Sequence, residues 1–302
     1  MRSVRSLGEV GLIARLARRL HEPASVHTAI GDDAAVLRGP GGTLWLFACD
    51  MLVENTHFRR GRLPAEWIGW KALACNVSDI AAMGGRPHWA VVSLGLPPAT
   101  PVRFVDEVYR GLERCAKRFG VAIVGGDTTR APQVVMDVAI LGTVIPRHLT
   151  LRSGARPGDA VFVTGRLGGS YRSGRHARFS PRLAEAQRLV RTVKVHAMMD
   201  FSDGLASDLW QMSRASRAQF QVEAARIPVA RAARSVYHAL MDGEDFELLF
   251  TVGPRDASRV PRRLGACPVT RIGAVTGRGI GVTLVQPSGR ITPIVPKGFR
   301  HF

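Results

Sequence analysis

The chain has 302 residues, of which 46% are hydrophobic and 22% are charged, and this composition excludes a short peptide or a disordered chain. Forty-two lysines and arginines stand against 24 aspartates and glutamates, so the formal net charge is +18 at pH 7. Such a surplus attracts polyanions, and the charge alone does not choose among nucleic acids, nucleotides and phosphorylated metabolites. Because 38 of the 42 basic residues are arginines, codon composition explains the excess equally well.

The hydrophobic residues occur in short runs. The longest apolar stretches are far shorter than the ~20 residues of a membrane-spanning helix, so we expect no membrane partner. The cysteines lie far apart and form no C-x-x-C pair, which argues against a zinc site and against a disulfide scaffold. Reduced cysteines in a cytoplasmic protein are therefore the expectation for Cys49, Cys75, Cys115 and Cys267.

The first half of the chain alternates helix-like and strand-like segments. Apolar residues at helical spacing predict a helix at 66–83, and a second predicted helix, at 101–119, opens with proline and ends before a glycine. Short apolar runs predict strands around these helices at 43–49, 90–96, 121–124 and 134–144. This order is typical of an α/β domain.

A turn-rich stretch at 146–159 separates this half from a second one, so we place a domain boundary near residue 148. The second half again mixes helices, predicted at 181–191, 204–216 and 229–240, with strands, predicted at 160–164, 196–199, 247–252 and 269–274. We expect an α/β domain at 1–148 and another at 149–302, in a fold of the α+β or α/β sandwich class.

Aspartates recur where an apolar run breaks into glycine or small polar residues, and one more lies on the long predicted helix, on the same face as Asn76 and opposite the apolar face. Each aspartate alone is equally compatible with ordinary turn chemistry. Together they form a candidate site, because open α/β folds gather ligands at strand ends. Carboxylates that meet there repel one another unless cations neutralise them, and oxygen ligands without a Cys or His cluster indicate Mg²⁺. The set is Asp33, Asp50, Asp79, Asp127 and Asp200.

A glycine pair, Gly125–Gly126, lies next to one of these aspartates and lets the backbone approach a phosphate closely. Metal ligands beside a glycine-lined phosphate site indicate phosphoryl transfer, in which positioning and charge neutralisation do most of the catalysis. The chain has no G-x-x-x-x-G-K-[ST] loop and neither the H-R-D nor the D-F-G element. A nucleotide enzyme with this sequence therefore has another architecture.

Eight motifs, in order along nearly the whole chain, resemble those of the thiamine-monophosphate kinase family. They are GDDAAVL (31–37), DMLVENTHF (50–58), KALACNVSDIAAMGGRP (71–87), GGDTTR (125–130), TLRSGARPGD (150–159), MDFSDGLASDL (199–209), GEDFELLFTV (243–252) and KGFRHF (297–302). Any one of them is a weak signal, whereas eight in the same order make an accidental similarity very improbable.

The resemblance implies the aminoimidazole-ribonucleotide-synthetase-like superfamily, with an N-terminal domain that pairs with its copy in a homodimer and a C-terminal α/β domain. It implies direct transfer of phosphate from the co-substrate ATP to thiamine monophosphate, assisted by several Mg²⁺ ions and without a covalent intermediate. By motif position, the implied Mg²⁺ ligands are Asp33, Asp50, Asp79, Asp127, Asp200 and Asp203. The implied ATP contacts are Gly126, Arg152 and Ser202. The thiamine phosphate site would be lined by His57, Glu244 and Phe299, whose ring would stack on the cationic heterocycle.

The chain departs from the family pattern in three places. Ala48 and Cys49 replace the usual Ser or Thr hydroxyls, and a thiol is a poor Mg²⁺ ligand, so we expect a different metal affinity or number of ions. The segment 171–196 is shorter than in the family and rich in arginine, and Arg300 replaces an acidic residue. The resemblance therefore supports the ATP and metal sites more strongly than it supports the identity of the phosphate acceptor.

Two alternatives remain at this point. One is another ATP-dependent enzyme of the superfamily, such as a selenophosphate synthetase or a ribonucleotide cyclo-ligase, although no cysteine precedes Cys49 to serve the first reaction. The other is a basic RNA-binding protein. Only 7% of the residues are aromatic and they are not interleaved with basic ones, so we expect no specific nucleic-acid partner.

Overall fold

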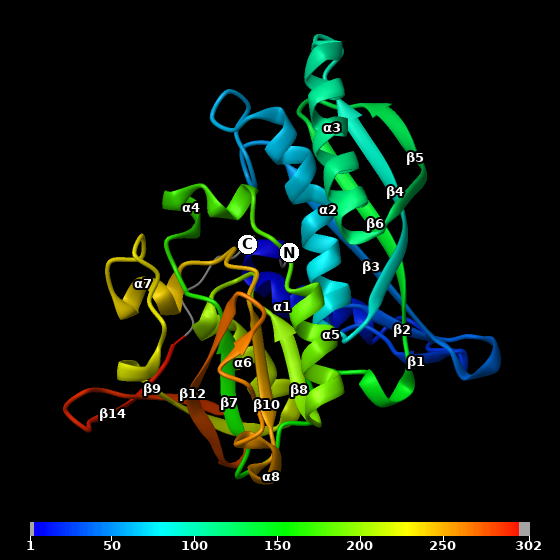
Figure 1. The fold of residues 1–302 in the computed structure, drawn as a ribbon. Helices are drawn as coiled ribbons and strands as arrows, with labels where there is room; N and C mark the ends of the chain where they lie inside the picture. The colour runs from blue at the N-terminus through cyan, green and yellow to red at the C-terminus, as the bar shows by residue number, and fades with distance from the viewer. Residues whose placement is uncertain (1–2, 296–302) are drawn as a thin grey trace.

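Two β-sheets with helices packed on them make up the structure, a computed structural model that describes residues 3–295 (Figure 1). The first sheet is built from residues 26–144 and the second from residues 160–293. The 3₁₀ helix Pro146–His148 lies in the connection between them, close to the predicted boundary, and the exact bounds of the two domains stay a prediction. Among the described residues no helix is both long enough and apolar enough to cross a membrane.

The first sheet has one core face and one exposed face. Alternate residues of its central strands, such as Leu46 and Ile140, are buried, whereas Phe47 and Val91, which lie on the opposite face, are exposed. Adjacent strands are antiparallel except β4 and β5, which are parallel. The strand order is β1 (Val26–Thr28), β2 (Ala35–Arg38), β3 (Leu44–Val53), β6 (Val135–Val144), β4 (Arg86–Leu96) and β5 (Ala122–Arg130).

Helices α2 (Ala65–Ala82) and α3 (Val102–Phe119) cover the core face (Figure 1). The prediction that α2 has a polar face opposite its apolar face is wrong. The side of α2 that the first sheet and α3 leave open is covered by α5 (Leu183–Thr192) and by the second sheet. Asn76 is fully buried there, and its amide donates to the backbone oxygen of Ala72 at 3.0 Å. Helix α2 is thus the element that both sheets share.

Two glycines let α2 and α3 approach each other. A Cβ atom at Gly69 would lie 1.8 Å from the carbonyl oxygen of Val108, and one at Gly111 would lie 1.8 Å from that of Glu66. We expect Gly111→Ala to lower the free energy of unfolding by about 2 kcal/mol or more, because the helix backbones must separate. The control is Gly11→Ala in α1 (Val4–Ala17), because a Cβ at Gly11 would meet only the Cβ of Leu7, at an ordinary contact distance of 3.7 Å. Urea unfolding measures both variants, and equal effects would contradict the close-approach argument.

One end of the second sheet consists of three largely buried strands, β7 (Ala160–Thr164), β10 (Leu248–Val252) and the edge strand β8 (Val195–Asp200), whose first two residues are half-buried. Phe162 and Phe250 stack with ring centroids 5.4 Å apart and belong to the core shared with the first sheet. The opposite face packs on α6 (Leu205–Ser216). The remaining strands are β14 (Ile291–Pro293), β13 (Gly281–Val285), β9 (Ala218–Glu223) and β12 (Cys267–Arg278), with β11 (Arg263–Leu264) beside β12.

Shorter helices complete the described residues: the 3₁₀ helices Pro40–Gly42, Arg175–Ala177 and Ala224–Arg226, and α4 (Ser170–Ser173), α7 (Val236–Met241) and α8 (Pro254–Ala257). Most predicted elements form, but α7 is much shorter than the predicted helix at 229–240. The backbone of Ala230 instead donates to the oxygen of Leu167 at 2.9 Å, and Val229 forms a bridge with the same residue. This tertiary pairing prevents the helix from starting earlier.

Several strands extend further than predicted, and two of these extensions include an aspartate that was expected at a strand end. Strand β3 pairs with β6 as far as Val53, and β5 pairs with β4 as far as Arg130. Asp50 and Asp127 therefore lie inside strands, and their predicted places at strand ends are wrong. The reason is that a neighbouring strand supplies hydrogen bonds to a polar segment that its own sequence would not identify as β.

Candidate active site

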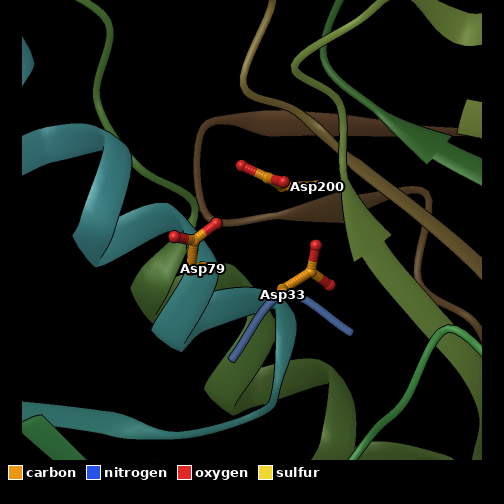
Figure 2. A group of neighbouring side chains, drawn as sticks. All are labelled: Asp33, Asp79 and Asp200. Carbon is orange, nitrogen blue, oxygen red and sulfur yellow. The ribbon is translucent and has the colours of Figure 1, made fainter. Parts of the chain in front are cut away.

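Three aspartates from distant parts of the chain converge between the two sheets. Asp33 lies in the loop between β1 and β2, Asp79 in the last turn of α2, and Asp200 at the end of β8. One carboxylate oxygen of each lies within 4.8 Å of the others, and Figure 2 shows the three side chains directed toward a common space. Asp33 and Asp200 are buried, and Asp79 is half-buried. We call these three residues the acidic centre.

Burial and mutual repulsion disfavour the ionised form of the acidic centre. Burial raises the pKa of Asp200 to about 8, and the charge of Asp33 adds to the shift. The pKa of Asp79 is raised well above its ordinary value, first by burial and then by the charges of Asp50 and Asp200. Burial also raises the pKa of Asp33, against the opposing charge of Arg152. A cation in this space would therefore stabilise the ionised carboxylates.

Asp50 lies beside the acidic centre. Along β3 its side chain takes the same face as the buried Ala48 and Leu52. Burial raises its pKa to about 6, followed by the charges of Asp137 and Asp33. Asp50 is therefore an electrostatic neighbour of the three converging carboxylates, and its predicted role as a ligand stays a prediction.

The acidic centre has the ligand chemistry that Mg²⁺ prefers, with carboxylate oxygens and no imidazole or thiolate. One of these oxygens, Oδ2 of Asp33, is buried and has no hydrogen-bond partner among the residues that the structure describes. On Asp200, Oδ2 accepts a hydrogen bond from Oγ of Ser78 at 2.5 Å, which orients that carboxylate. A buried, unpartnered carboxylate oxygen among like charges fits a divalent cation.

Arg152 contacts the acidic centre directly. Its Nε and Nη2 donate to Oδ1 of Asp33 at 3.0 and 2.5 Å, and its Nη1 donates to Oε1 of Gln211 at 2.7 Å. The backbone N–H of Arg152 donates to both carboxylate oxygens of Asp32 at 3.1 Å. This guanidinium neutralises part of the acidic centre, and its planar fork also suits a phosphate. The ATP contact expected of Arg152 stays a prediction.

A second polar group lies two turns earlier on α2. Lys71 is almost fully buried, forms an ion pair with Glu244, and donates to the backbone oxygen of His57 at 3.3 Å. Nδ1 of His57 accepts from the backbone N–H of Val53 at 2.9 Å. The backbone N–H of Glu244 donates to the carbonyl of Ser202 at 2.7 Å. The structure thus joins His57 and Glu244, two of the residues expected around the acceptor, through a lysine.

Asp127 lies apart from the acidic centre within one chain. It is exposed on β5 and lies in register with Ser93 of β4. Ser93 pairs with Asp137 of β6, and Asp137 pairs with the exposed Met51 of β3. Since residues in register share a face and neighbours alternate, Asp127 lies on the face opposite to that of Asp50. The adjacent Gly126 is also exposed, and a Cβ there would lie 1.8 Å from the oxygen of Val92. Their metal and ATP roles stay predictions.

Asp203 lies just before α6, close to the acidic centre in sequence and space. Its Oδ2 accepts from Nε2 of Gln211 at 3.1 Å, so Gln211 connects Asp203 with Arg152. Ser202 precedes it, and the metal and ATP roles of the two residues stay predictions. The predicted substrate residue Phe299 lies outside the described residues.

Several residues of the site escaped the sequence prediction, among them Asp32, Lys71, Asp208 and Gln211. Asp208 is fully buried, its Oδ2 has no hydrogen-bond partner within residues 3–295, and burial raises its pKa well above the ordinary value. Sequence signals could have found two of them. Lys71 is one of only four lysines and lies in an apolar segment, and Asp208 lies in the same motif as Asp200, MDFSDGLASDL (199–209).

Two family models match the chain, the AIR synthase related protein N-terminal domain over residues 31–144 and the AIR synthase related protein C-terminal domain over residues 170–285. A thiamine-monophosphate kinase of Rhodopirellula baltica is 39% identical over 97% of this chain and 97% of its own length. One of Bacillus subtilis is 32% identical over 98% of this chain and 100% of its own length. The chain belongs to the thiamine-monophosphate kinase family.

Solved structures agree with this assignment. AaThiL complexed with AMPPCP and TMP superimposes with a TM-score of 0.87 at 30% identity, covering 100% of this chain and 99% of that one. The hydrogenase maturation protein HypE in complex with ATP has a TM-score of 0.72 at 22% identity, with 86% of each chain covered, and shows a shared fold. These matches confirm the predicted family and the predicted two-domain AIR-synthase-like fold of mixed sheets and helices. They favour this family over the two alternatives, another enzyme of the superfamily and an RNA-binding protein.

Proposed function

We propose that this family member transfers the γ-phosphate of ATP to thiamine monophosphate and so forms ADP and thiamine diphosphate. It is similar over nearly its whole length to relatives named thiamine-monophosphate kinase and to the AaThiL structure complexed with AMPPCP and TMP. The observation that carries the proposal is the position of the acidic centre beside Arg152 and near the pair formed by Lys71 and Glu244. Asp79 lies eight positions after Lys71 on α2, which corresponds to a rise of about 12 Å, a distance that two linked phosphates and an acceptor can span.

Two anions must meet in this reaction, so the site must neutralise charge. The residues that would hold Mg²⁺ are Asp33, Asp79 and Asp200, with Asp50 beside them. Bound there, Mg²⁺ would screen the phosphates and the charge on the transferred group. Once Asp33 turns to a cation, the guanidinium of Arg152 can bind a phosphate through its two parallel N–H groups.

The acceptor would lie on the side of Lys71. Its buried ammonium supplies a fixed positive charge toward the phosphate of thiamine monophosphate, and the half-exposed carboxylate of Glu244 remains accessible to a cationic or amino-bearing ring. His57 is held by two backbone contacts and would shape the wall of this site. With Phe299, which the family pattern adds, these residues would line the acceptor.

The direct test is incubation of the purified chain with ATP, Mg²⁺ and thiamine monophosphate, with free thiamine as a parallel acceptor. We expect equal amounts of ADP and thiamine diphosphate from the monophosphate and neither product from thiamine. Chromatography quantifies both products in the same sample. ADP without thiamine diphosphate would contradict the assigned acceptor, and no ADP would contradict the kinase reaction.

We also propose that the chain forms a homodimer through the exposed face of the first sheet. Apolar side chains gather on that face and each is 39% exposed or more: Phe47, Met51, Trp89, Val91 and Val124. Contiguous apolar surface on a sheet is typical of a protein interface. Asp127 and Gly126 lie on the neighbouring edge strand, so pairing of two copies would place these residues at the boundary between subunits.

Substitution of Phe47 by aspartate is expected to convert a dimer into a monomer, because two buried charges would face each other across the interface. Light scattering coupled to size exclusion measures the mass. The matched control is Val102→Asp at the start of α3, where an isolated valine is 74% exposed. A wild-type monomer, or dimers for both variants, would exclude this face as the interface.

For the place of action we propose the cytoplasm. All four cysteines are free in the structure, and three of them are buried, as expected for a protein that folds in a reducing compartment.

A further inference from the structure

A groove with a basic rim lies where the two sheets are joined, past the C-terminal end of α2. Its volume is about 720 Å³, and it is lined by the loop 41–43, the start of β4, the connection 143–148 and the last turns of α5. None of the residues proposed for the active site lines it. The groove is therefore distinct from the acidic centre, and nothing in the proposed kinase reaction uses it.

Three arginines from three separate elements line this groove. Arg86 begins β4, Arg147 lies in the 3₁₀ helix that connects the sheets, and Arg191 lies in the last turn of α5. None of the three forms an ion pair within residues 3–295, and no carboxylate lines the groove. Elsewhere in the described chain many arginines, such as Arg152 and Arg175, are paired with buried carboxylates. The unpaired guanidinium groups leave this groove with uncompensated positive charge.

The charges of two of these arginines both act on a histidine in the groove. His148 also lines the groove, and its pKa is lowered by burial and by the charges of Arg147 and Arg191. In the lining loop, Gly41 and Gly42 have left-handed backbone conformations with φ of +64° and +78°, and a Cβ at either would meet nothing within 4 Å. An anion could therefore approach the main chain of this loop without steric obstruction.

We propose that the groove binds a small anion with several phosphate charges, namely free polyphosphate or the phosphate chain of a nucleotide. Guanidinium groups that line one groove with no competing carboxylate suit phosphate, because each can bind it through parallel N–H groups. The volume of about 720 Å³ exceeds what one monovalent anion would fill, and three positive charges suit a chain of phosphates. Because Arg86 belongs to the first sheet and Arg191 to a helix that packs beside the second, the anion would bind the two sheets to each other.

The test separates this groove from the active site by removing metal ions. In EDTA the acidic centre repels phosphate, so calorimetric titration of the full chain with inorganic tripolyphosphate reports on the groove. We expect one site per chain and an affinity at least about tenfold weaker in the double variant Arg86→Gln/Arg191→Gln. The control is Arg255→Gln/Arg290→Gln, which removes the same charge from exposed positions outside the groove. We expect its affinity to stay within about twofold of the wild type.

Equal losses in the two double variants would show only nonspecific charge attraction and would overturn the proposal, as would no binding by the wild type. A parallel titration with ATP in EDTA identifies the source of the phosphate chain. Equal affinity for ATP and tripolyphosphate supports free polyphosphate, and tighter binding of ATP that is lost in the Arg86→Gln/Arg191→Gln variant supports a nucleotide. Thermal unfolding of both variants verifies that they fold. Since the arginines lie outside the active site, kinase activity and groove binding fail independently.

Discussion

Substitution of Asp79 by asparagine is expected to lower turnover by about 10²–10³-fold while making the metal-free protein more stable. Turnover falls because the acidic centre loses one of three charges that would hold Mg²⁺ on the reacting phosphates. Stability rises because the pKa of Asp79 is raised well above its ordinary value by burial and by neighbouring carboxylates, so its ionised form opposes folding at neutral pH. Steady-state kinetics at saturating Mg²⁺ and thermal unfolding in EDTA measure the two effects.

The opposite signs make this experiment decisive. A variant that lost activity through misfolding would have a lower Tm, whereas loss of a metal ligand combines low turnover with a higher Tm in EDTA. The matched control is Asp106→Asn on the exposed side of α3, where we expect turnover within about twofold of the wild type and an unchanged Tm. Near-normal turnover of the Asp79 variant would remove that residue from the metal site.

Mg²⁺ is expected to raise the Tm strongly at pH 8 and weakly at pH 5.5. The folded-state pKa values of the acidic centre are raised, with Asp200 at about 8, so the folded protein binds more protons than the unfolded chain between pH 4 and 8. The contribution of these carboxylates to stability is therefore fully present below their unfolded pKa of about 4 and is lost as the pH rises through the folded values. Magnesium supplies the missing charge neutralisation at pH 8, where Asp200 is already about half ionised, whereas at pH 5.5 it must displace protons from the acidic centre.

Thermal unfolding with and without Mg²⁺ at each pH measures this effect. At a concentration of about 100 times the dissociation constant, binding stabilises by about 2.7 kcal/mol, which corresponds to about 5 °C in a chain of this size. The informative quantity is the difference in Tm between the samples with and without Mg²⁺ at the same pH. Buried histidines such as His176 have lowered pKa values and change stability with pH in both samples alike, so their effect cancels in this difference. A magnesium effect that is larger at pH 5.5 than at pH 8 would contradict the raised pKa values. Ca²⁺ at equal concentration tests whether the effect depends on the ion's size.

The local elements that the sequence predicted well are those in which side-chain pattern and packing agree. The helices predicted at 66–83 and 101–119 form as Ala65–Ala82 and Val102–Phe119. Their ends carry strong local signals, such as Gly120, whose φ of +69° ends α3. Strand ends are less local, because the partner strand decides how far pairing continues. Asp50 and Asp127 therefore lie inside β3 and β5 rather than at their ends.

Some site residues could likewise be identified from the sequence, whereas others could be identified only from the fold. The sequence motifs identified every member of the acidic centre, because Asp33, Asp79 and Asp200 each lie in a motif of the family. The buried pair of Lys71 and Glu244 joins residues 173 positions apart, and no spacing rule connects them. Similarly, the family pattern groups Asp127 with the other aspartates, whereas the strand register places it on the opposite face of the first sheet.

By itself, the sequence determined the family, the mixed α/β character and the kinds of ligand atom available, because these depend on which residues occur and in what order. Only the tertiary structure decided which carboxylates meet, which lysine is buried and which arginines stay unpaired. Distances between residues far apart in the chain follow from how α2 packs between two sheets, and burial follows from what covers each side chain (Figure 1). Since pKa values depend on both burial and distance, the electrostatics of the acidic centre could not be derived before the fold was known.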